Sequence, residues 1–217
     1  MRIITFIVFS LVLLTSCASK DAVSVIAPDV MKNRVILAIW DSLTAWYGLP
    51  EAESYPAQLE AKLALLGYSY RVENAGVSGD TSAGLFSRMD WILEGDTPSL
   101  VILCIGANDA LQGKSVTDIE ANIRMTIEKI KAKNIPILFA GMKAPLNLGW
   151  EYGRQYEAMF ARLAKEYKMV FMPFLLEWVA LKASLNQEDR IHPTKAGYAI
   201  VVDNILEILK DEKLIQK

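Results

Sequence analysis

The sequence predicts an α/β fold in which helices cover both faces of a parallel sheet. From residue 34 onward, five apolar, strand-like runs alternate with segments of helical periodicity, and this alternation is typical of parallel sheets. The 217 residues are 53% hydrophobic and 22% charged, which suits one globular domain with a sizeable core. Polar residues follow several of the apolar runs, where the edge of such a sheet binds ligands.

The first half of this domain is expected to contain three strands and two helices. The first strand is an apolar, β-branched run that stops at Asp41-Ser42-Leu43-Thr44. The first helix tolerates Pro56 in its first turn and ends at Gly67. The expected elements are strand 34–39, helix 55–66, strand 68–75, a tight loop over 76–82 that leads into a helix to about Leu93, and strand 99–105.

The second half is expected to repeat the alternation. Ser115 and Thr117 are plausible caps for its first helix because their hydroxyls can accept from free backbone N–H groups. The expected elements are helix 115–133, strand 135–142, helix 152–167, strand 169–174 and a last helix over about 194–209.

The N-terminus reads as an export signal. A basic start, Met1-Arg2, precedes an apolar run over 3–14, which is too short to span a bilayer but fits the apolar region of a secretory signal. The following Leu14-Thr15-Ser16-Cys17 resembles the bacterial lipobox, although an ordinary signal with a chance cysteine is the alternative. We therefore expect a lipoprotein signal peptide over 1–16, a lipidated Cys17 with a flexible tether over 17–33, and the globular domain over 34–217.

Composition excludes several classes of function. A net charge of −2 and an isoelectric point near 5.6 argue against nucleic acid as a partner. One histidine and no cysteine cluster supply too few ligands of the usual kind for a metal site, so neither metal nor cofactor is expected. Loss of the signal and lipidation of Cys17 would leave Cys104 as the sole free thiol, which excludes an internal disulfide. No obligate protein partner is evident.

A nucleophilic serine is the chemistry that the polar residues favour. Ser42 follows the first strand, and a serine needs a base to take its proton. The single histidine, His192, must be that base, and Asp189 lies three residues earlier, where it can orient the imidazole. The backbone N–H of Gly79 and the amide of Asn108 can supply oxyanion donors.

Each of these residues also has an ordinary structural interpretation. Asp41 or Ser42 could cap a helix, Gly79 could serve only a turn, Asn108 could bond its own backbone, and His192 could be an exposed loop residue. Their occurrence in order at the ends of strands or helices favours the catalytic interpretation.

Together the blocks Asp41-Ser42-Leu43, Gly79 in SGDTS, Asn108 in GAND and Asp189-x-x-His192 resemble those of the SGNH (GDSL) hydrolase superfamily. The likeness runs from about Val35 to the C-terminus and is strongest to the thioesterase I / lysophospholipase L1 / arylesterase branch. It implies a flavodoxin-like, three-layer α/β/α sandwich with about five parallel strands.

The resemblance also implies a reaction, the hydrolysis of acyl esters or thioesters through an acyl-enzyme. Ser42 would be the nucleophile and His192 its base, with Asp189 orienting the base. The N–H groups of Ser42 and Gly79 and the side chain of Asn108 would form the oxyanion hole. The partners implied are a small-molecule acyl ester or thioester and, through Cys17, a membrane, so the protein is expected to be exported and anchored at the periplasmic side or cell surface.

Two tryptophans depart from the family pattern. Trp40 replaces the usual glycine beside the nucleophile, and Trp46 replaces a residue that is commonly small. Glycine leaves room for substrate and for a tight turn. We expect at least one of the two indoles to narrow the acyl site.

Three other functions compete with this interpretation. A carbohydrate O-deacetylase of the same superfamily would use the same groups, although the apolar Leu146, Leu148 and Trp150 favour acyl chains. A flavodoxin-like FMN binder would use Ser42 and Thr44 as a phosphate loop but leaves His192 unexplained. A non-catalytic lipoprotein would have its site closed by Trp40.

Overall fold

The computed structural model describes residues 34–95 and 97–217, so the expected signal peptide, Cys17 and the tether lie outside the described residues. Five parallel strands form one sheet with the order β2-β1-β3-β4-β5. This confirms the predicted α/β class and its flavodoxin-like sandwich. The strands are β1 (Val35–Ile39), β2 (Arg71–Asn74), β3 (Leu100–Leu103), β4 (Ile137–Ala140) and β5 (Val170–Met172).

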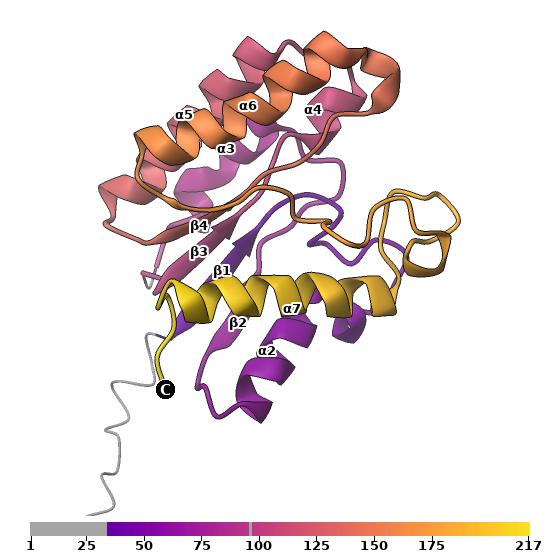
Figure 1. The fold of residues 1–217 in the computed structure, drawn as a ribbon. Helices are drawn as coiled ribbons and strands as arrows, with labels where there is room; N and C mark the ends of the chain where they lie inside the picture. Colours follow the sequence, from indigo (N-terminus) through magenta and orange to yellow (C-terminus); the bar gives the residue numbers. More distant parts are fainter. Residues whose placement is uncertain (1–33, 96) are drawn as a thin grey trace, which may run out of the picture.

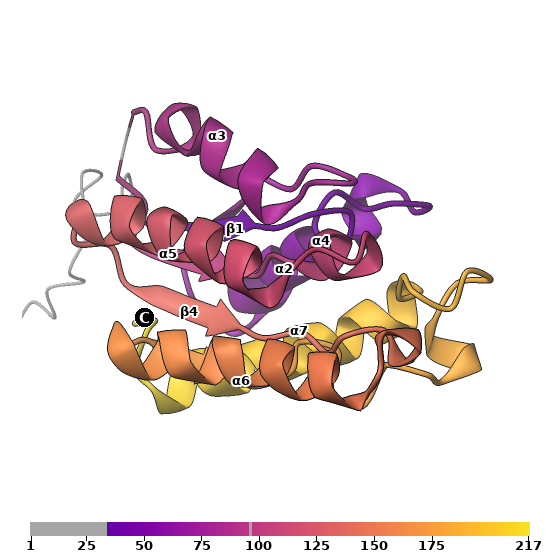
Figure 2. The same ribbon diagram turned by 90° about the horizontal axis from the view of Figure 1, so that it is seen from above.

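Helices pack in one layer on each face of the sheet (Figures 1 and 2). One layer contains α3 (Ser82–Ile92), α5 (Val116–Ala132) and α6 (Trp150–Glu166), where α5 packs against both of the others. The other layer contains α2 (Tyr55–Leu65) and α7 (Lys195–Asp211). The shorter elements are α4 (Ala107–Leu111) and three 3-10 turns, η1 (Glu51–Glu53), η2 (Leu146–Leu148) and η3 (Ala183–Leu185).

Burial follows the position of each strand in the sheet. Every residue of β1, β3 and β4 is buried, whereas the edge strands β2 and β5 are only partly buried. A strand covered on both faces reads as a continuous apolar run. All five strands are shorter than the sequence predicted, because most of the apolar residues that flank them pack in or against the core without pairing in the ladder.

Side-chain caps fix where several helices begin. The hydroxyls of Ser54, Thr81, Ser115 and Thr194 each accept from the backbone N–H three residues later, at the starts of α2, α3, α5 and α7. Such a cap satisfies a donor that the helix itself leaves free. The Ser115 cap confirms the prediction for that helix. The short helix α4 was not predicted from the sequence, because one turn and a half carries no readable period.

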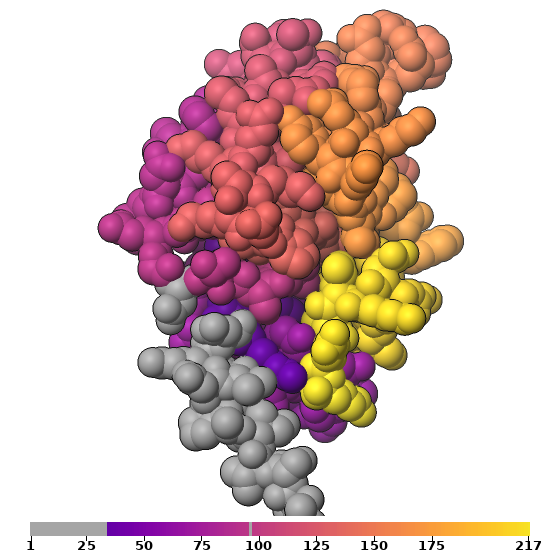
Figure 3. Space-filling model, turned by 90° about the vertical axis from the view of Figure 1, so that its left-hand side faces the viewer, coloured from indigo at the N-terminus to yellow at the C-terminus, as the bar shows by residue number. Residues whose placement is uncertain are grey.

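The chain enters the sheet at the edge where its C-terminus also lies. Figure 3 looks onto this end and shows the yellow C-terminal residues beside the start of the domain. The guanidinium of Arg34 donates to the carbonyl of Gln216 at 3.0 Å and lies over the ring of Tyr70. None of the helices described is long and apolar enough to cross a membrane.

Candidate active site

Three loops carry the predicted site residues to one edge of the sheet. Ser42 follows β1, Gly79 lies between β2 and α3, and Asn108 lies in α4, directly after β3. These three strands are neighbours, and the chain order reverses between β1 and β3. Crevices at such a reversal, outside the carboxyl ends of the strands, are where open α/β sheets bind ligands.

The turn after β1 is held by Asp41. Its Oδ1 accepts from the N–H of Leu43 at 3.0 Å, and its carbonyl accepts from the N–H groups of Thr44 and Ala45 at 3.1 and 3.0 Å. The chain thus makes a single tight turn rather than continuing as a helix. Ser42 is half-buried at the start of this turn.

A continuous hydrogen-bonded relay joins Ser42 to the last loop of the chain. Ser42 Oγ lies 2.8 Å from His192 Nε2, and His192 Nδ1 lies 2.6 Å from Asp189 Oδ2. The imidazole is 12% exposed, whereas the carboxylate side chain is 34% exposed. With Nδ1–H donating to Asp189, Nε2 is left free to accept the serine proton.

Asp189 is bound by its own loop as well as by the imidazole. Its Oδ1 accepts from the N–H groups of Ile191 and His192 at 2.9 and 3.0 Å. Burial acts to raise the pKa of Asp189, but these two bonds and the imidazole outweigh it and hold the pKa below its ordinary value. The carboxylate therefore stays ionised at neutral pH.

Two backbone donors beside the nucleophile remain free. Among the hydrogen bonds of the described residues, none uses the N–H of Ser42 or of Gly79. Gly79 has φ +80° and would meet no atom within 4 Å if it carried a Cβ. Its left-handed backbone suits glycine, and the open space beside it leaves room for a ligand.

Asn108 already uses both of its amide hydrogens. Its Nδ2 donates to Asp41 Oδ2 at 3.1 Å and to the carbonyl of Asp80 at 2.9 Å. Next to it, the buried carboxylate of Asp109 accepts from the N–H and hydroxyl of Ser82 at 2.7 and 2.8 Å. Helix α4 is thereby tied to the start of α3, and Asn108 must give up or share one bond to donate to a substrate.

Asp41 is the most perturbed acid of this cluster. It is 1% exposed, and burial raises its pKa to about 7, with the nearby charge of Asp80 acting in the same direction and the N–H of Leu43 opposing it. Desolvation penalises the ionised form of an acid. The carboxyl that binds both the nucleophile turn and Asn108 therefore changes charge near neutral pH.

Two residues of the site were missed in the sequence. The ring of Tyr47 lies against His192, with centroids 4.5 Å apart. Gln187 links the two loops, because its N–H donates to the carbonyl of His192 at 2.7 Å and its Nε2 donates to that of Tyr47 at 2.9 Å. A single tyrosine and a single glutamine carry no motif, so only the position of each beside a predicted catalytic residue could have indicated a role.

The two tryptophans occupy different surroundings. Trp40 is 1% exposed and packs edge-to-face on Tyr55 of α2, with ring centroids 6.3 Å apart. The expectation that at least one of the two indoles narrows the acyl site therefore cannot rest on Trp40, because its side chain is buried in the core against Tyr55 of α2. The alternative in which Trp40 closes the site loses its support for the same reason. Trp46 is 37% exposed in the turn beyond Ser42, with φ +50°, so a role for it beside the acyl group stays a prediction.

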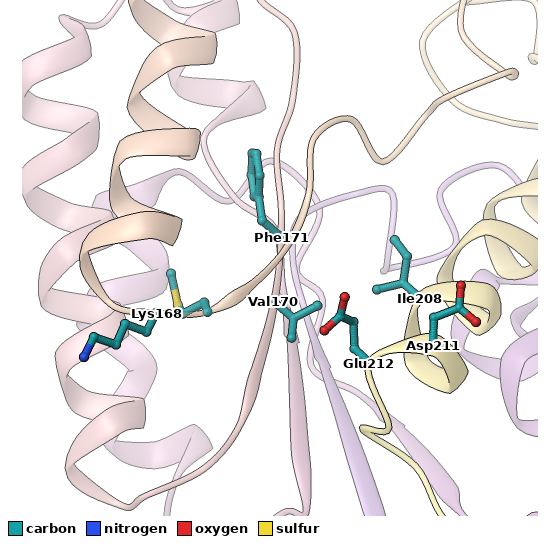
Figure 4. Close-up of a pocket in the computed structure, with 7 residues that line it drawn as sticks. Lys168, Val170, Phe171, Ile208, Asp211 and Glu212 are labelled. Atoms are coloured by element: carbon teal, nitrogen blue, oxygen red, sulfur yellow. The ribbon is translucent and has the colours of Figure 1, made fainter.

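A hollow in the described surface lies away from this cluster. It has a volume of about 450 Å³ and opens between β5 and the end of α7. Figure 4 shows the carboxyl groups of Asp211 and Glu212 on its α7 side. It is lined by Lys168, Met169, Val170, Phe171, Ile208, Asp211 and Glu212, none of which belongs to the Ser42 cluster.

The chain is similar to known proteins along most of its length. Residues 39–200 match the GDSL-like Lipase/Acylhydrolase family. The chain is 33% identical to "Esterase TesA" of Pseudomonas aeruginosa over 82% of its own length and 88% of that protein. It is 32% identical to "Thioesterase 1/protease 1/lysophospholipase L1" of Escherichia coli, over 77% and 79% of the two chains.

A solved structure gives the same likeness in three dimensions. The crystal structure of AlinE4, described as an SGNH-hydrolase family esterase, superposes with a TM-score of 0.70 at 41% sequence identity. The match covers 83% of this chain and 96% of AlinE4. The sheet order and the helix layers described above are thus those of a known hydrolase fold.

Proposed function

Because the chain belongs to the GDSL-like lipase/acylhydrolase family, and is thus a hydrolase of the SGNH type, we propose that it cleaves carboxylic esters or thioesters through an acyl-enzyme on Ser42. The observation that carries the proposal is the relay from Ser42 Oγ through His192 to Asp189, at 2.8 and 2.6 Å. Both distances fall within the range that proton transfer to a general base requires.

Each group then has a step. His192 Nε2 takes the proton of Ser42 as Oγ attacks the acyl carbon. The N–H groups of Ser42 and Gly79, together with the side-chain amide of Asn108, stabilise the oxyanion. The imidazolium gives its proton to the leaving alcohol or thiol, and the acyl group stays on Oγ. Water, deprotonated by His192, attacks the acyl-enzyme and releases the acid and free Ser42.

Replacing the nucleophile tests this assignment. Ser42→Ala should leave the fold intact and lower kcat for a soluble ester by about four to six orders of magnitude. His192→Ala should cost a similar factor, and the double variant little more, because the two residues act as a unit. Near-normal hydrolysis by Ser42→Ala would sink the proposal.

A large, partly exposed side chain follows the nucleophile closely in the sequence. Trp46 lies in the turn beyond the nucleophile, so we propose that its indole limits the length of the acyl chain. Trp46→Gly should raise kcat/KM for longer esters in a panel of graded chain length and leave short ones nearly unchanged. An unchanged profile would remove Trp46 from the site. Preferred hydrolysis of acetylated sugars over the same panel would favour an O-deacetylase instead.

We also propose that the protein is exported and held at a membrane by lipid on Cys17. The supporting pattern is the apolar run over 3–14 followed by the lipobox-like Leu14-Thr15-Ser16-Cys17. Several acyl chains on one residue anchor a protein stably, whereas a single chain holds it marginally. Cys17→Ser should release the protein from membranes or block its processing, and normal processing with unchanged membrane fractionation would exclude the anchor.

A further inference from the structure

Exposed apolar side chains gather at the catalytic edge of the sheet. Of the twelve large apolar side chains that are exposed among the described residues, nine follow the carboxyl end of a strand. The four that we call the apolar rim are 67% to 89% exposed. They come from the segments after β4 and β5 and are Leu146, Trp150, Trp178 and Leu181.

The two segments of the apolar rim lie beside each other. Strands β4 and β5 are paired neighbours in the sheet, and both segments leave it at the end opposite the C-terminus (Figures 1 and 2). His192 also lies in the second segment, so the rim and the Ser42 relay are both built from loops at this end of the sheet. A contiguous exposed apolar surface with polar surroundings marks an interaction site.

Each tryptophan of the rim carries a cation on its ring. The guanidinium of Arg154 lies 5.4 Å from the Trp150 ring centroid, and the ammonium of Lys182 lies 5.8 Å from that of Trp178. Indole rings with adjacent basic groups are the side chains enriched where proteins meet the headgroup region of a bilayer. The apolar ring enters the acyl boundary while the cation remains among the headgroups.

The charge of these segments points to an uncharged apolar partner. Residues 141–154 and 173–194 together contain four basic and four acidic side chains, so their net charge is zero with His192 neutral. The balance provides no net attraction for a polyanion or for a strongly charged protein. Apolar contact, rather than charge, would have to supply the binding.

We infer that the apolar rim docks onto the surface of a phospholipid bilayer and turns the Ser42 edge toward it. The chain leaves the described domain at Arg34, on the opposite edge of the sheet, and the sixteen residues from Ala18 to Asn33 reach about 50 Å when extended. A domain of this size is about 40 Å across. A lipid on Cys17 therefore leaves enough chain for the catalytic edge to reach the same bilayer.

The inference goes beyond the proposed hydrolysis, and its experiment separates the two. The protein is expressed from residue 17 onward with Cys17→Ser, so that no attached lipid binds the vesicles, and with Ser42→Ala, so that no lipid is cleaved. Binding is measured by flotation with neutral phosphatidylcholine vesicles, and depth by quenching of tryptophan fluorescence with brominated phosphatidylcholine. The test protein is a double variant, Trp150→Ala with Trp178→Ala, which removes both indoles of the rim. The control is Trp91→Ala in α3, which removes an indole that is 72% exposed outside the rim.

The double variant should bind vesicles at least about tenfold more weakly, because two exposed indoles supply much of the insertable area. Trp91→Ala should bind normally, and raised salt should change little. In a Ser42 background, the otherwise unchanged protein, Trp178→Ala and Trp91→Ala should hydrolyse a soluble short ester within twofold of each other. If the otherwise unchanged protein does not hydrolyse that ester, the result counts against the proposed function alone. No vesicle binding, equal binding by variant and control, or binding abolished by salt would each overturn the docking. The docking would also be overturned if the protein self-associates without lipid and only the double variant loses this self-association. That result would assign the rim to contact with a second copy of the chain.

Discussion

The two edges of the sheet both contain non-glycine residues with left-handed backbone, but in different settings. At the amino edge, Asn134, Lys168 and Lys213 each lie two residues beyond the last residue of a long helix. At the carboxyl edge, none of the four such residues follows a helix; they are Trp46, Trp178, Leu181 and Arg190. A left-handed conformation costs a residue with a Cβ about 1–2 kcal/mol, so each position needs a compensating interaction.

At the amino edge the compensation is local. After α6, the N–H of Lys168 donates to the carbonyl of Lys165 and that of Met169 donates to the carbonyl of Ala164. This is the usual termination of a helix, which satisfies its last carbonyls. The left-handed residue there serves the helix that precedes it.

At the carboxyl edge the compensation is tertiary. Arg190 stands between Asp189 and His192, and the two are joined across it by two hydrogen bonds to the same carboxylate. Trp46 ends the turn that holds Ser42 and precedes Tyr47, whose ring lies on His192. Strained backbone persists where surrounding structure fixes it, and it gathers at functional sites. The difference indicates that substitutions at this edge should change activity, whereas equivalent ones at the amino edge should change only stability.

The largest contrast should come from Asp189. Asp189→Asn can present its amide N–H to His192 and so favour the tautomer that cannot accept from Ser42, which should lower kcat by about 10⁴. Glu188→Gln, the neighbouring exposed carboxylate, should change kcat by less than twofold. Both are measured with a soluble ester. If Asp189→Asn kept a tenth of the activity or more, orientation of His192 would not depend on this carboxylate.

A second contrast concerns the pH dependence of stability. The native pKa of Asp41 is raised to about 7 from its ordinary 3.8, so the native state binds more protons than the unfolded chain between about pH 4 and pH 7. Stability from this group is therefore lost as pH rises through that interval, by about 4 kcal/mol in all, and is constant above it. Asp41→Asn should remove this decline, as measured by urea unfolding at pH 4.5 and pH 8.

The matched control is Asp211→Asn, which removes an exposed carboxyl at the amino edge. It should leave the wild-type decline in place. If the unfolding free energies of Asp41→Asn and Asp211→Asn had the same pH dependence, ionisation of the buried Asp41 carboxyl would not be the cause of the decline.

Asn108 should give the next effect. Its amide donates to Asp41 and Asp80, which lie in the same loops as the free N–H groups of Ser42 and Gly79. If it also donates to the oxyanion, Asn108→Ala should lower kcat by roughly 10²–10³ with little change in KM. Asn204→Ala removes an amide that donates to the carbonyl of Glu177 outside the cluster and should leave both constants unchanged. A rise in KM alone would mean that Asn108 positions substrate instead of stabilising the oxyanion.

The sequence could predict those features that depend on local pattern. Continuous apolar runs in the sequence predicted β1, β3 and β4, which are buried on both faces. A hydroxyl residue predicted the start of α5. The positions of Ser42, Gly79 and Asn108 at one edge followed from strand ends alone, because parallel strands bring their carboxyl ends together.

Features set by distant contacts could not be predicted. Trp40 was expected near the catalytic edge of the sheet because it directly precedes Asp41, but packing against Tyr55, fifteen residues away, places it in the core. The bonds that occupy the amide of Asn108 come from Asp41 and Asp80, on two other loops. Neither hydrogen bond can be predicted from hydrophobic periodicity or secondary-structure propensity, because both depend on how three loops pack together.

Glycine substitutions at the left-handed residues should have the smallest effects, and they compare the amino and carboxyl edges of the sheet most directly. Lys168→Gly removes the Cβ strain at a helix end and should stabilise the protein by about 0.5–1 kcal/mol, after allowance for the freer unfolded chain, with kcat unchanged. Arg190→Gly relieves the same strain between Asp189 and His192, so it should gain similar or less stability. It should also lower kcat severalfold, because the two residues lose a fixed backbone between them. Urea unfolding and ester hydrolysis measure both variants, and equal kcat values would show that the left-handed residue at 190 serves only its turn.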